Sequence, residues 1–145
     1  MTAEIISVGT ELLLGNILNT NAQYLSRELA ALGITVRRQS TIGDNHGRLA
    51  DFVNEAKQRC DLLVFTGGLG PTYDDMTKET VAGVFGLALE YHPEVMEEIQ
   101  QYFDRVFHRP MPACNRQQAM LPQGCTVLHN PVGTAPGCIF TAGGV

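Results

Sequence analysis

The sequence lacks the features that would assign the chain to several large functional classes. Its ten Lys and Arg residues are scattered apart from the Arg37-Arg38 pair, and the formal net charge is −5, so the basic surface that nucleic-acid binding requires is missing. No apolar run approaches about 18 residues, and residues 1–5 have neither the basic start nor the long apolar stretch of a signal peptide. The chain is therefore predicted to be cytoplasmic, with no nucleic-acid partner and no membrane partner.

The spacing of cysteines and histidines argues against two further kinds of site. The four cysteines lie too far apart for a C-x-x-C pair, and a chain without an export signal keeps its thiols reduced; they are Cys60, Cys114, Cys125 and Cys138. The four histidines show no H-x₃₋₅-H spacing from which a zinc site could be built. Buried or half-buried thiols and surface or helix-capping histidines are expected instead.

The composition predicts a single globular domain over residues 1–145. The chain is 44% hydrophobic and 17% charged, which suffices for one core that buries about two thirds of the unfolded surface. Along the first half, short apolar segments alternate with amphipathic ones. Strands are predicted at residues 4–8, 34–40 and 61–65, and helices from Asn21 to Gly33 and from a cap at Asp44 or Asn45 to Cys60.

This alternation predicts the fold class. Short strands separated by helices of ten to fifteen residues form parallel sheets with right-handed crossovers and helices on both faces. The chain is therefore expected to be α/β, a three-layer α/β/α domain with a mostly parallel sheet, in which residues 34–40 lie nearer the sheet edge.

The second half is predicted to be more helical. Seven apolar side chains after Pro93 recur at three-and-four spacing and indicate an amphipathic helix packed on the core; they are Val95, Met96, Ile99, Tyr102, Phe103, Val106 and Phe107. A shorter helix is predicted at residues 111–120, and strands at 126–129 and 138–141. Residues 142–144 indicate a hairpin turn whose return strand is not in the sequence, so a domain truncated at its C-terminus, lacking its last strand and helix, is expected.

One loop carries most of the functional information. Residues 66–77, TGGLGPTYDDMT, directly follow the apolar run at 61–65. Gly67, Gly68 and Gly70 let the backbone turn sharply and approach a ligand, so that its N–H groups can face phosphate oxygens. Thr77 is predicted to cap a helix over residues 78–85, whose N-terminus points toward the same place. Lys78 in the first turn opposes the helix dipole, so it is expected either to point into solvent or to meet an anion.

Two adjacent carboxylates in this loop have two interpretations. Asp74 and Asp75 could simply stabilise the helix N-terminus. Alternatively they bind a divalent cation, because carboxylates beside a phosphate site repel the phosphate unless a cation lies between them, and Mg²⁺ or a similar hard ion suits such ligands. The glycine loop favours the second interpretation.

Two other loops are candidates for the same site. Ligands of open parallel sheets bind outside the carboxyl ends of the strands, where residues 9–21 bring Glu11 and a polar cluster at Asn19, Thr20 and Asn21. These three could cap a helix or contact a ligand. Residues 130–137, NPVGTAPG, have two prolines and two glycines, so their shape is largely prescribed and their backbone can lie against a ligand.

Known catalytic motifs match only in part. Gly68-Leu69-Gly70 begins like a dinucleotide fingerprint, but Tyr73 stands where the third glycine belongs, and no Gly-Lys-Ser/Thr follows for a P-loop. There is no Gly-x-Ser-x-Gly elbow and no cysteine nucleophile motif, so metal-assisted attack by water is favoured over covalent catalysis.

Four segments resemble a known family. Residues 7–15 (SVGTELLLG), 19–21 (NTN), 66–77 and 130–137 are similar to the N-terminal domain of the competence/damage-inducible CinA family, within the wider molybdopterin-binding superfamily of MoaB and MogA type. The resemblance implies a metal-dependent pyrophosphatase that acts on ADP-ribose and similar nucleotides with Mg²⁺, Co²⁺, Ni²⁺ or Mn²⁺, in a homo-oligomer. Alternatives are a molybdopterin-binding or adenylyl-transferring protein of molybdenum cofactor biosynthesis, with molybdopterin as ligand, and a non-catalytic binding module or truncated fragment.

The predicted site combines these residues in three roles. Asp74, Asp75 and Lys78 are the candidate catalytic residues, and Asp74, Asp75 and Glu11 are the candidate metal ligands. The candidate phosphate- and nucleotide-binding residues are Gly9, Thr10, Asn19, Thr66, Gly67, Gly68, Leu69, Gly70, Thr72, Thr77, Gly133, Thr134 and Gly137.

Overall fold

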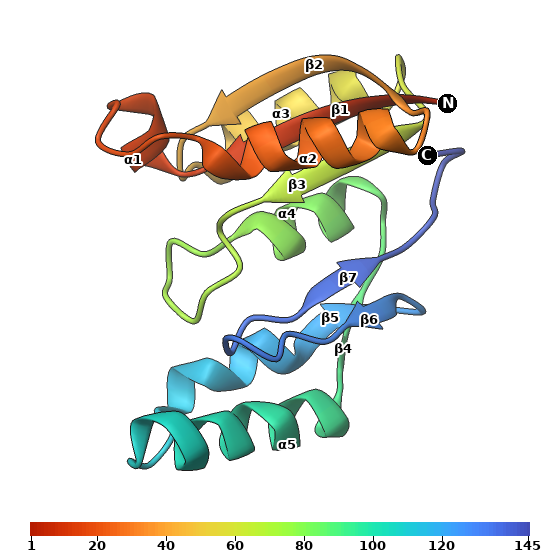
Figure 1. Ribbon diagram of the computed structural model, residues 1–145. Coiled ribbons are helices and arrows are strands. Elements are labelled where there is room, and N and C mark those ends of the chain that lie inside the picture. Colours follow the sequence, from red (N-terminus) through yellow and green to blue (C-terminus); the bar gives the residue numbers. More distant parts are fainter.

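A parallel three-stranded sheet forms the centre of the computed structural model, which describes residues 1–145 (Figure 1). Strand β1 (Thr2–Val8) lies between β2 (Thr35–Ile42) and β3 (Leu62–Thr66), and both pairings are parallel. Every residue of β1 from Ala3 onward is buried, as the middle strand of a covered parallel sheet requires. The predicted α/β class and the edge position of β2 are confirmed.

Helices cover both faces of this sheet. On one face Ala3 and Ile5 of β1 pack against Ala22 and Leu29 of α2 (Thr20–Ala31). On the other face Ile6 and Val8 pack against α3 (His46–Ala56) and α4 (Thr77–Val84) through the buried side chains of Leu49, Val53 and Val81. Because successive strand residues point to opposite faces, β1 supplies both layers of the core.

Local signals set the ends of these helices. The side chains of Asn19 and Asn45 accept hydrogen bonds from the N–H groups of Ala22 (3.2 Å) and Arg48 (3.0 Å), so both residues are N-caps. Gly33 follows α2 with φ +76°, the left-handed conformation that commonly ends helices at glycine. The predicted ends of α2 and the predicted cap of α3 are thus confirmed.

The second half forms a separate layer below the sheet (Figure 1). It contains α5 (Pro93–Tyr102), a π-helical turn η1 (Phe103–Phe107), a 3₁₀ segment η2 (Ala113–Ala119) and two antiparallel strand pairs. Strand β4 (Leu89–Tyr91) pairs with β5 (Met120–Pro122), and β6 (Thr126–Leu128) pairs with β7 (Gly137–Ile139). No helix of the chain has the length and apolar character that crossing a bilayer demands.

This layer corrects three expectations. A single core was expected, but Val95, Ile99 and Phe103 form their own cluster with η2 and β5, away from the parallel sheet. Val106 and Phe107 were expected to face inward but are largely exposed, because the π turn widens the helix and breaks the three-and-four spacing. The helix expected at residues 111–120 is the 3₁₀ segment η2.

The hairpin turn near the end of the chain is present. Ala142 and Val145 exchange both backbone hydrogen bonds, at 3.0 and 3.1 Å, around Gly143 and Gly144. Both glycines have positive φ, +60° and +88°, which two-residue hairpin turns require.

The outer edge of β3 has no strand partner. An apolar groove with a cavity of about 360 Å³ runs along this edge, between β3, α4 and the segment Gly137–Phe140. Phe140 packs edge-on against Phe85, with ring centroids 5.7 Å apart, whereas Ile139 is 55% exposed. The sheet therefore presents unpaired backbone groups to an apolar channel.

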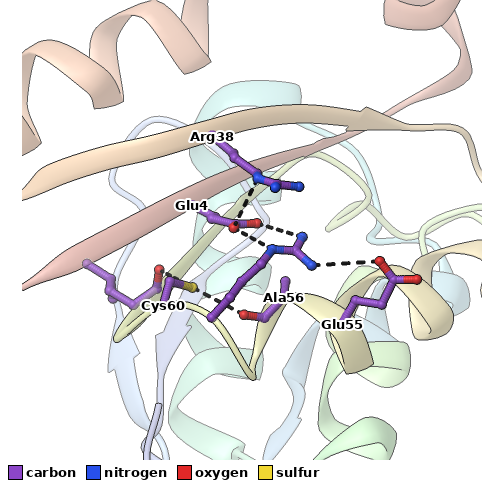
Figure 2. Close-up of polar contacts among 7 residues, drawn as sticks. Glu4, Arg38, Glu55, Ala56 and Cys60 are labelled. Carbon is purple, nitrogen blue, oxygen red and sulfur yellow. Dashed lines mark hydrogen bonds and ion pairs between the residues drawn. The ribbon is translucent and has the colours of Figure 1, made fainter.

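A buried carboxylate joins the sheet to the turn that follows α3, away from the candidate site. Glu4 of β1 is only 2% exposed and accepts two hydrogen bonds from Arg59, at 2.7 and 3.0 Å. Figure 2 shows Arg38 on the other side of Glu4, at 3.9 Å, and Glu55 beside the Arg59 guanidinium. The bidentate geometry satisfies a charge that would otherwise be costly to bury.

All four cysteines are free thiols. Cys60 is buried and donates toward the carbonyl oxygens of Ala56 and Leu62 (Figure 2). Cys125 and Cys138 are half-buried, as expected, whereas Cys114 is exposed, contrary to the expectation of buried or half-buried thiols. Burial, together with the neighbouring Cys125, raises the pKa of Cys138 to about 11. A thiol with so high a pKa is a poor nucleophile at neutral pH.

Candidate phosphate site

Three segments follow the carboxyl ends of the parallel strands, all at the same end of the sheet (Figure 1). Gly9 follows β1, Gly43 follows β2 and Gly67 follows β3. Backbone contacts hold the first two loops together, since the N–H of Gly9 donates to the carbonyl of Ile42 at 2.9 Å. These loops thus gather outside the carboxyl ends of the strands, where the sequence predicts the site.

The first two glycines of the loop after β3 are required by its geometry. Gly67 and Gly68 have φ of +92° and +63°, where side chains are strained. A Cβ atom on Gly67 would lie 2.0 Å from the carbonyl oxygen of Val8, and one on Gly68 would lie 2.2 Å from the Thr77 hydroxyl. No other residue fits these two positions without moving β1 or α4.

This conformation leaves backbone donors free. The N–H groups of Gly67, Gly68 and Leu69 have no acceptor in the protein. Free N–H groups on successive residues of a turn form a concave site for an anion. The loop can therefore bind phosphate oxygens without displacing any hydrogen bond of its own.

Thr77 joins this loop to the helix that follows. It was predicted to be the N-cap of α4, but the N-cap is Met76, and Thr77 is the first helical residue. Its N–H donates to the carbonyl of Gly68 at 3.1 Å and its hydroxyl donates to the carbonyl of Gly67 at 2.8 Å. Because the hydroxyl is bonded to the Gly67 carbonyl, the Thr77 side chain shapes the loop and does not cap the helix.

Asp75 is engaged within the loop. Its carboxylate accepts hydrogen bonds from the hydroxyl (2.5 Å) and the N–H (2.9 Å) of Thr72. Burial opposes ionisation, but the bonds from Thr72 and from the N–H of Gly70 outweigh it and lower the pKa of Asp75. Asp74, in contrast, is exposed and accepts no hydrogen bond. The two adjacent aspartates thus differ in role: Asp75 holds the turn, and Asp74 is free to meet a ligand.

Thr10 and Glu11 begin α1 (Thr10–Leu13), a short helix that follows β1 after Gly9. The carboxylate of Glu11 folds back over Gly9, where a Cβ atom would lie 2.6 Å from Oε1. Thr10 forms two reciprocal bonds with Asp44, one from its N–H (2.9 Å) and one to its hydroxyl (3.1 Å). Sequence reasoning treated Asp44 only as a possible helix cap, although its position two residues after β2 was a signal that it belongs to this end of the sheet.

The candidate metal ligands do not form a ready-made cage. No three Asp, Glu, His or Cys side chains come close enough together to hold a metal ion. Asp75 is also occupied by Thr72. Glu11 and Asp74 offer hard oxygen donors, and Mg²⁺ is commonly held by one or two carboxylates together with substrate phosphates. The residues present therefore do not fit a protein-only metal site.

Lys78 is buried and pairs with Glu79, so the expectation that it might point into solvent is wrong. It lines the groove beside β3 together with Thr77. The positive charge of Lys78 contributes to the lowered pKa of Asp75, so Lys78 stabilises the ionised Asp75 of the loop.

The two asparagines of the polar cluster at residues 19–21 have different hydrogen-bond partners. Asn19 caps α2 and donates to the Ser7 hydroxyl at 2.9 Å, so both ends of its amide are used. Asn21 donates to the Thr66 hydroxyl at 3.0 Å. Both lie at a cavity of about 130 Å³ that also reaches Gly67.

Two glutamines that sequence reasoning missed brace the glycine loop. Gln117 donates to the carbonyl of Thr72 at 3.0 Å, and buried Gln118 donates to the carbonyl of Leu69 at 3.4 Å. Both belong to η2, more than 40 residues further along the chain. Nothing in their local sequence indicated this contact.

The loop at residues 130–137 lies on other cavities. Gly133 and Thr134 line a polar depression against α5, where the Tyr102 hydroxyl donates to the carbonyl of Val132 at 2.9 Å. Gly137 pairs with Leu128 in the strand pair β6 and β7 and lines the groove beside β3. Gly133 and Thr134 thus line a cavity apart from the glycine loop, whereas Gly137 lines one groove together with Leu69, Thr77 and Lys78.

Comparison with known proteins places the whole chain in one family. A family described as probable molybdopterin binding domain matches residues 4–144. A protein of Acetivibrio thermocellus named as competence-damage inducible is 54% identical over 140 residues, which are 97% of this chain and 34% of that protein. A CinA-like protein of Trichormus variabilis is also 54% identical over 140 residues, 97% of this chain and 33% of that protein. The chain spans about a third of the length of the curated relatives it matches.

Solved structures agree with this assignment. The CinA protein of Thermoplasma acidophilum, described as having unknown function, is 35% identical with a TM-score of 0.88, over 99% of this chain and 84% of that one. The molybdopterin biosynthesis enzyme MoaB of Thermus thermophilus is 18% identical with a TM-score of 0.54, over 83% of this chain and 78% of that one. The second similarity shows a shared fold.

Proposed function

The chain belongs to the molybdopterin-binding domain family and its CinA branch, and from this premise we propose that it is a nucleotide pyrophosphatase acting on ADP-ribose-like substrates. The observation that carries the proposal is the glycine loop, whose three free N–H groups lie at the carboxyl end of β3 and beside the N-terminus of α4. These donors suit a diphosphate. Exposed Asp74 lies in the same loop, and exposed Glu11 lies in α1, which follows the adjacent strand β1.

In this reaction water adds to one phosphorus of the diphosphate and the bridging oxygen leaves with the other phosphate, which yields AMP and ribose 5-phosphate from ADP-ribose. The loop donors would stabilise the charge that accumulates on the phosphate oxygens as the transition state forms. Thr77, Asp75 and Gln118 would keep the donors in place, because each bonds the loop directly. A divalent cation bound together with the substrate would neutralise the diphosphate.

The direct test is incubation with ADP-ribose and Mg²⁺, Co²⁺, Ni²⁺ or Mn²⁺, followed by chromatography for AMP. Gly68→Val should abolish both binding and turnover, because its side chain would meet Thr77. Gly83→Ala is the matched control, since Gly83 lies in α4 with open space around it. Absence of AMP with every metal, while ADP-ribose still binds, would favour a non-catalytic binding module.

The role of the cation can be tested separately. Because the carboxylates form no cage, calorimetry should detect little Mg²⁺ binding to the protein alone and clear binding once ADP-ribose is present. Asp74→Asn and Glu11→Gln should raise the Mg²⁺ concentration needed for half-maximal turnover, whereas the distant Asp61→Asn should not. Tight Mg²⁺ binding without nucleotide would contradict the proposed arrangement.

A second candidate function is binding or adenylylation of molybdopterin, favoured by the family match over residues 4–144. The same loop would hold the pterin phosphate. Adenylyl transfer would release pyrophosphate from ATP, so detection of pyrophosphate with ATP and molybdopterin, and no AMP from ADP-ribose, would support this candidate over the first.

A further inference from the structure

A small cavity lies directly beside the first glycine of the phosphate loop. It measures about 130 Å³, and its lining includes apolar Leu12, Ile17 and Leu18 together with Glu11, Asn21, Thr66 and Gly67. Whole-ligand sites commonly measure about 300–1,000 Å³, so this cavity has room for one part of a ligand. Because Gly67 belongs to both, a ligand phosphate on the loop would place its neighbouring group at this cavity.

Two of the apolar side chains that line the cavity are exposed to solvent. Ile17 is 54% exposed and Leu18 is 86% exposed. The backbone around them is braced: the N–H of Asn16 donates to the carbonyl of Glu11 at 3.0 Å, and that of Thr20 to the carbonyl of Leu18 at 2.9 Å. Exposed apolar groups beside a polar site commonly mark a binding surface, and here they offer apolar contacts for a ring.

Asn21 and Thr66 offer the cavity one hydrogen-bond acceptor and one donor. Asn21 donates its amide N–H to the Thr66 hydroxyl oxygen at 3.0 Å, so the hydroxyl hydrogen of Thr66 points elsewhere and the amide oxygen of Asn21 has no partner. A heterocycle that carries an amino group next to a ring nitrogen presents the complementary donor and acceptor.

We infer that this cavity binds a planar nitrogen heterocycle, the purine of a nucleotide or the ring of a pterin, while the phosphate of the same ligand lies on the glycine loop. The inference rests on the proposed phosphate site and extends it to the ring. Leu18 and Ile17 contact the face of the ring, and Asn21 and Thr66 bond its edge. These four residues thus determine specificity for the base.

Binding measurements test the inference without requiring turnover. The wild-type protein is titrated calorimetrically with AMP, neopterin monophosphate and ribose 5-phosphate, which share a phosphate but differ in the ring. The wild type should bind AMP or neopterin monophosphate at least about tenfold more tightly than ribose 5-phosphate, and the stronger of the two identifies the ring.

Matched variants then assign the effect to the cavity. Leu18→Ser should weaken binding of the preferred ring ligand about fivefold, the loss of about 1 kcal/mol of contact, and leave ribose 5-phosphate unchanged. Leu14→Ser is the control, because Leu14 is 70% exposed on the same segment but does not line the cavity.

The outcomes separate the two proposals. Equal weakening of ring and ringless ligands in Leu18→Ser, or equal wild-type affinity for all three, would overturn the ring site while leaving phosphate binding intact. Selective AMP binding without any hydrolysis of ADP-ribose would support the ring site and overturn the pyrophosphatase. Failure of all three ligands to bind would overturn both.

Discussion

The hydroxyl of Thr77 donates a hydrogen bond of 2.8 Å to the carbonyl of Gly67, so the first residue of α4 holds the first glycine of the glycine loop. The same hydroxyl would lie 2.2 Å from a Cβ atom on Gly68. One side chain therefore both fixes the loop and makes glycine obligatory beside it.

Thr77→Val is expected to disrupt this arrangement. The isosteric change leaves the Gly67 carbonyl without its donor, which should lower the free energy of unfolding by about 1–3 kcal/mol and weaken AMP binding. Urea denaturation and calorimetry measure the two effects. Thr77→Ser keeps the hydroxyl and should retain most of both, and a valine variant as stable and as tightly binding as wild type would contradict the role.

Asp75 should make stability depend on acidity. Its pKa is lowered in the folded state, so its carboxylate stabilises the fold above the unfolded-state pKa of about 3.9, and this contribution is lost as the pH falls through the folded pKa. Asp75→Asn should therefore flatten the fall in unfolding free energy at acid pH, as followed by urea titration. Thr72→Val, which removes one donor to the carboxylate, should flatten it partly; an unchanged profile in both variants would show that the loop does not depend on this charge.

The pair of Glu4 and Arg59 should matter for stability and not for binding. Glu4→Ala leaves Arg59 without its bidentate partner and should cost about 3 kcal/mol or more, measured by chemical denaturation. Glu55→Ala is the control: Glu55 is 74% exposed at 3.7 Å from Arg59, and such surface pairs contribute about 0–1 kcal/mol. Because Glu4 lies near the opposite end of β1 from Gly9, AMP affinity should stay unchanged in both.

The free edge of β3 predicts self-association. Unpaired backbone groups beside an apolar groove and the exposed Ile139 can pair with another chain, which agrees with the expectation of a homo-oligomer. Sedimentation velocity should show association that rises with protein concentration and that Ile139→Lys suppresses. Leu32→Lys removes a similarly exposed apolar side chain at the end of α2 and should have no effect; a wild type that stays monomeric at high concentration would refute this interface.

The sequence by itself determined the elements of the parallel sheet and the position of the glycine loop. Alternation of strands and helices, caps such as Asn45, and the glycines at positions 67 and 68 are local signals, because periodicity, capping and positive φ each depend on a few neighbouring residues. These signals were enough to predict the α/β class, the edge position of β2 and the hairpin turn before Val145.

Only the tertiary structure decided which side chains meet. Thr77 was predicted to cap a helix, but its hydroxyl bonds the carbonyl of Gly67 at 2.8 Å and so holds the loop. Gln118, 49 residues further along the chain, donates to the carbonyl of Leu69. Likewise Gly133 and Thr134 lie against α5 and not on the cavity beside Gly67. Contacts between distant segments depend on how the layers pack, and no local pattern in the sequence predicts which distant residues will meet.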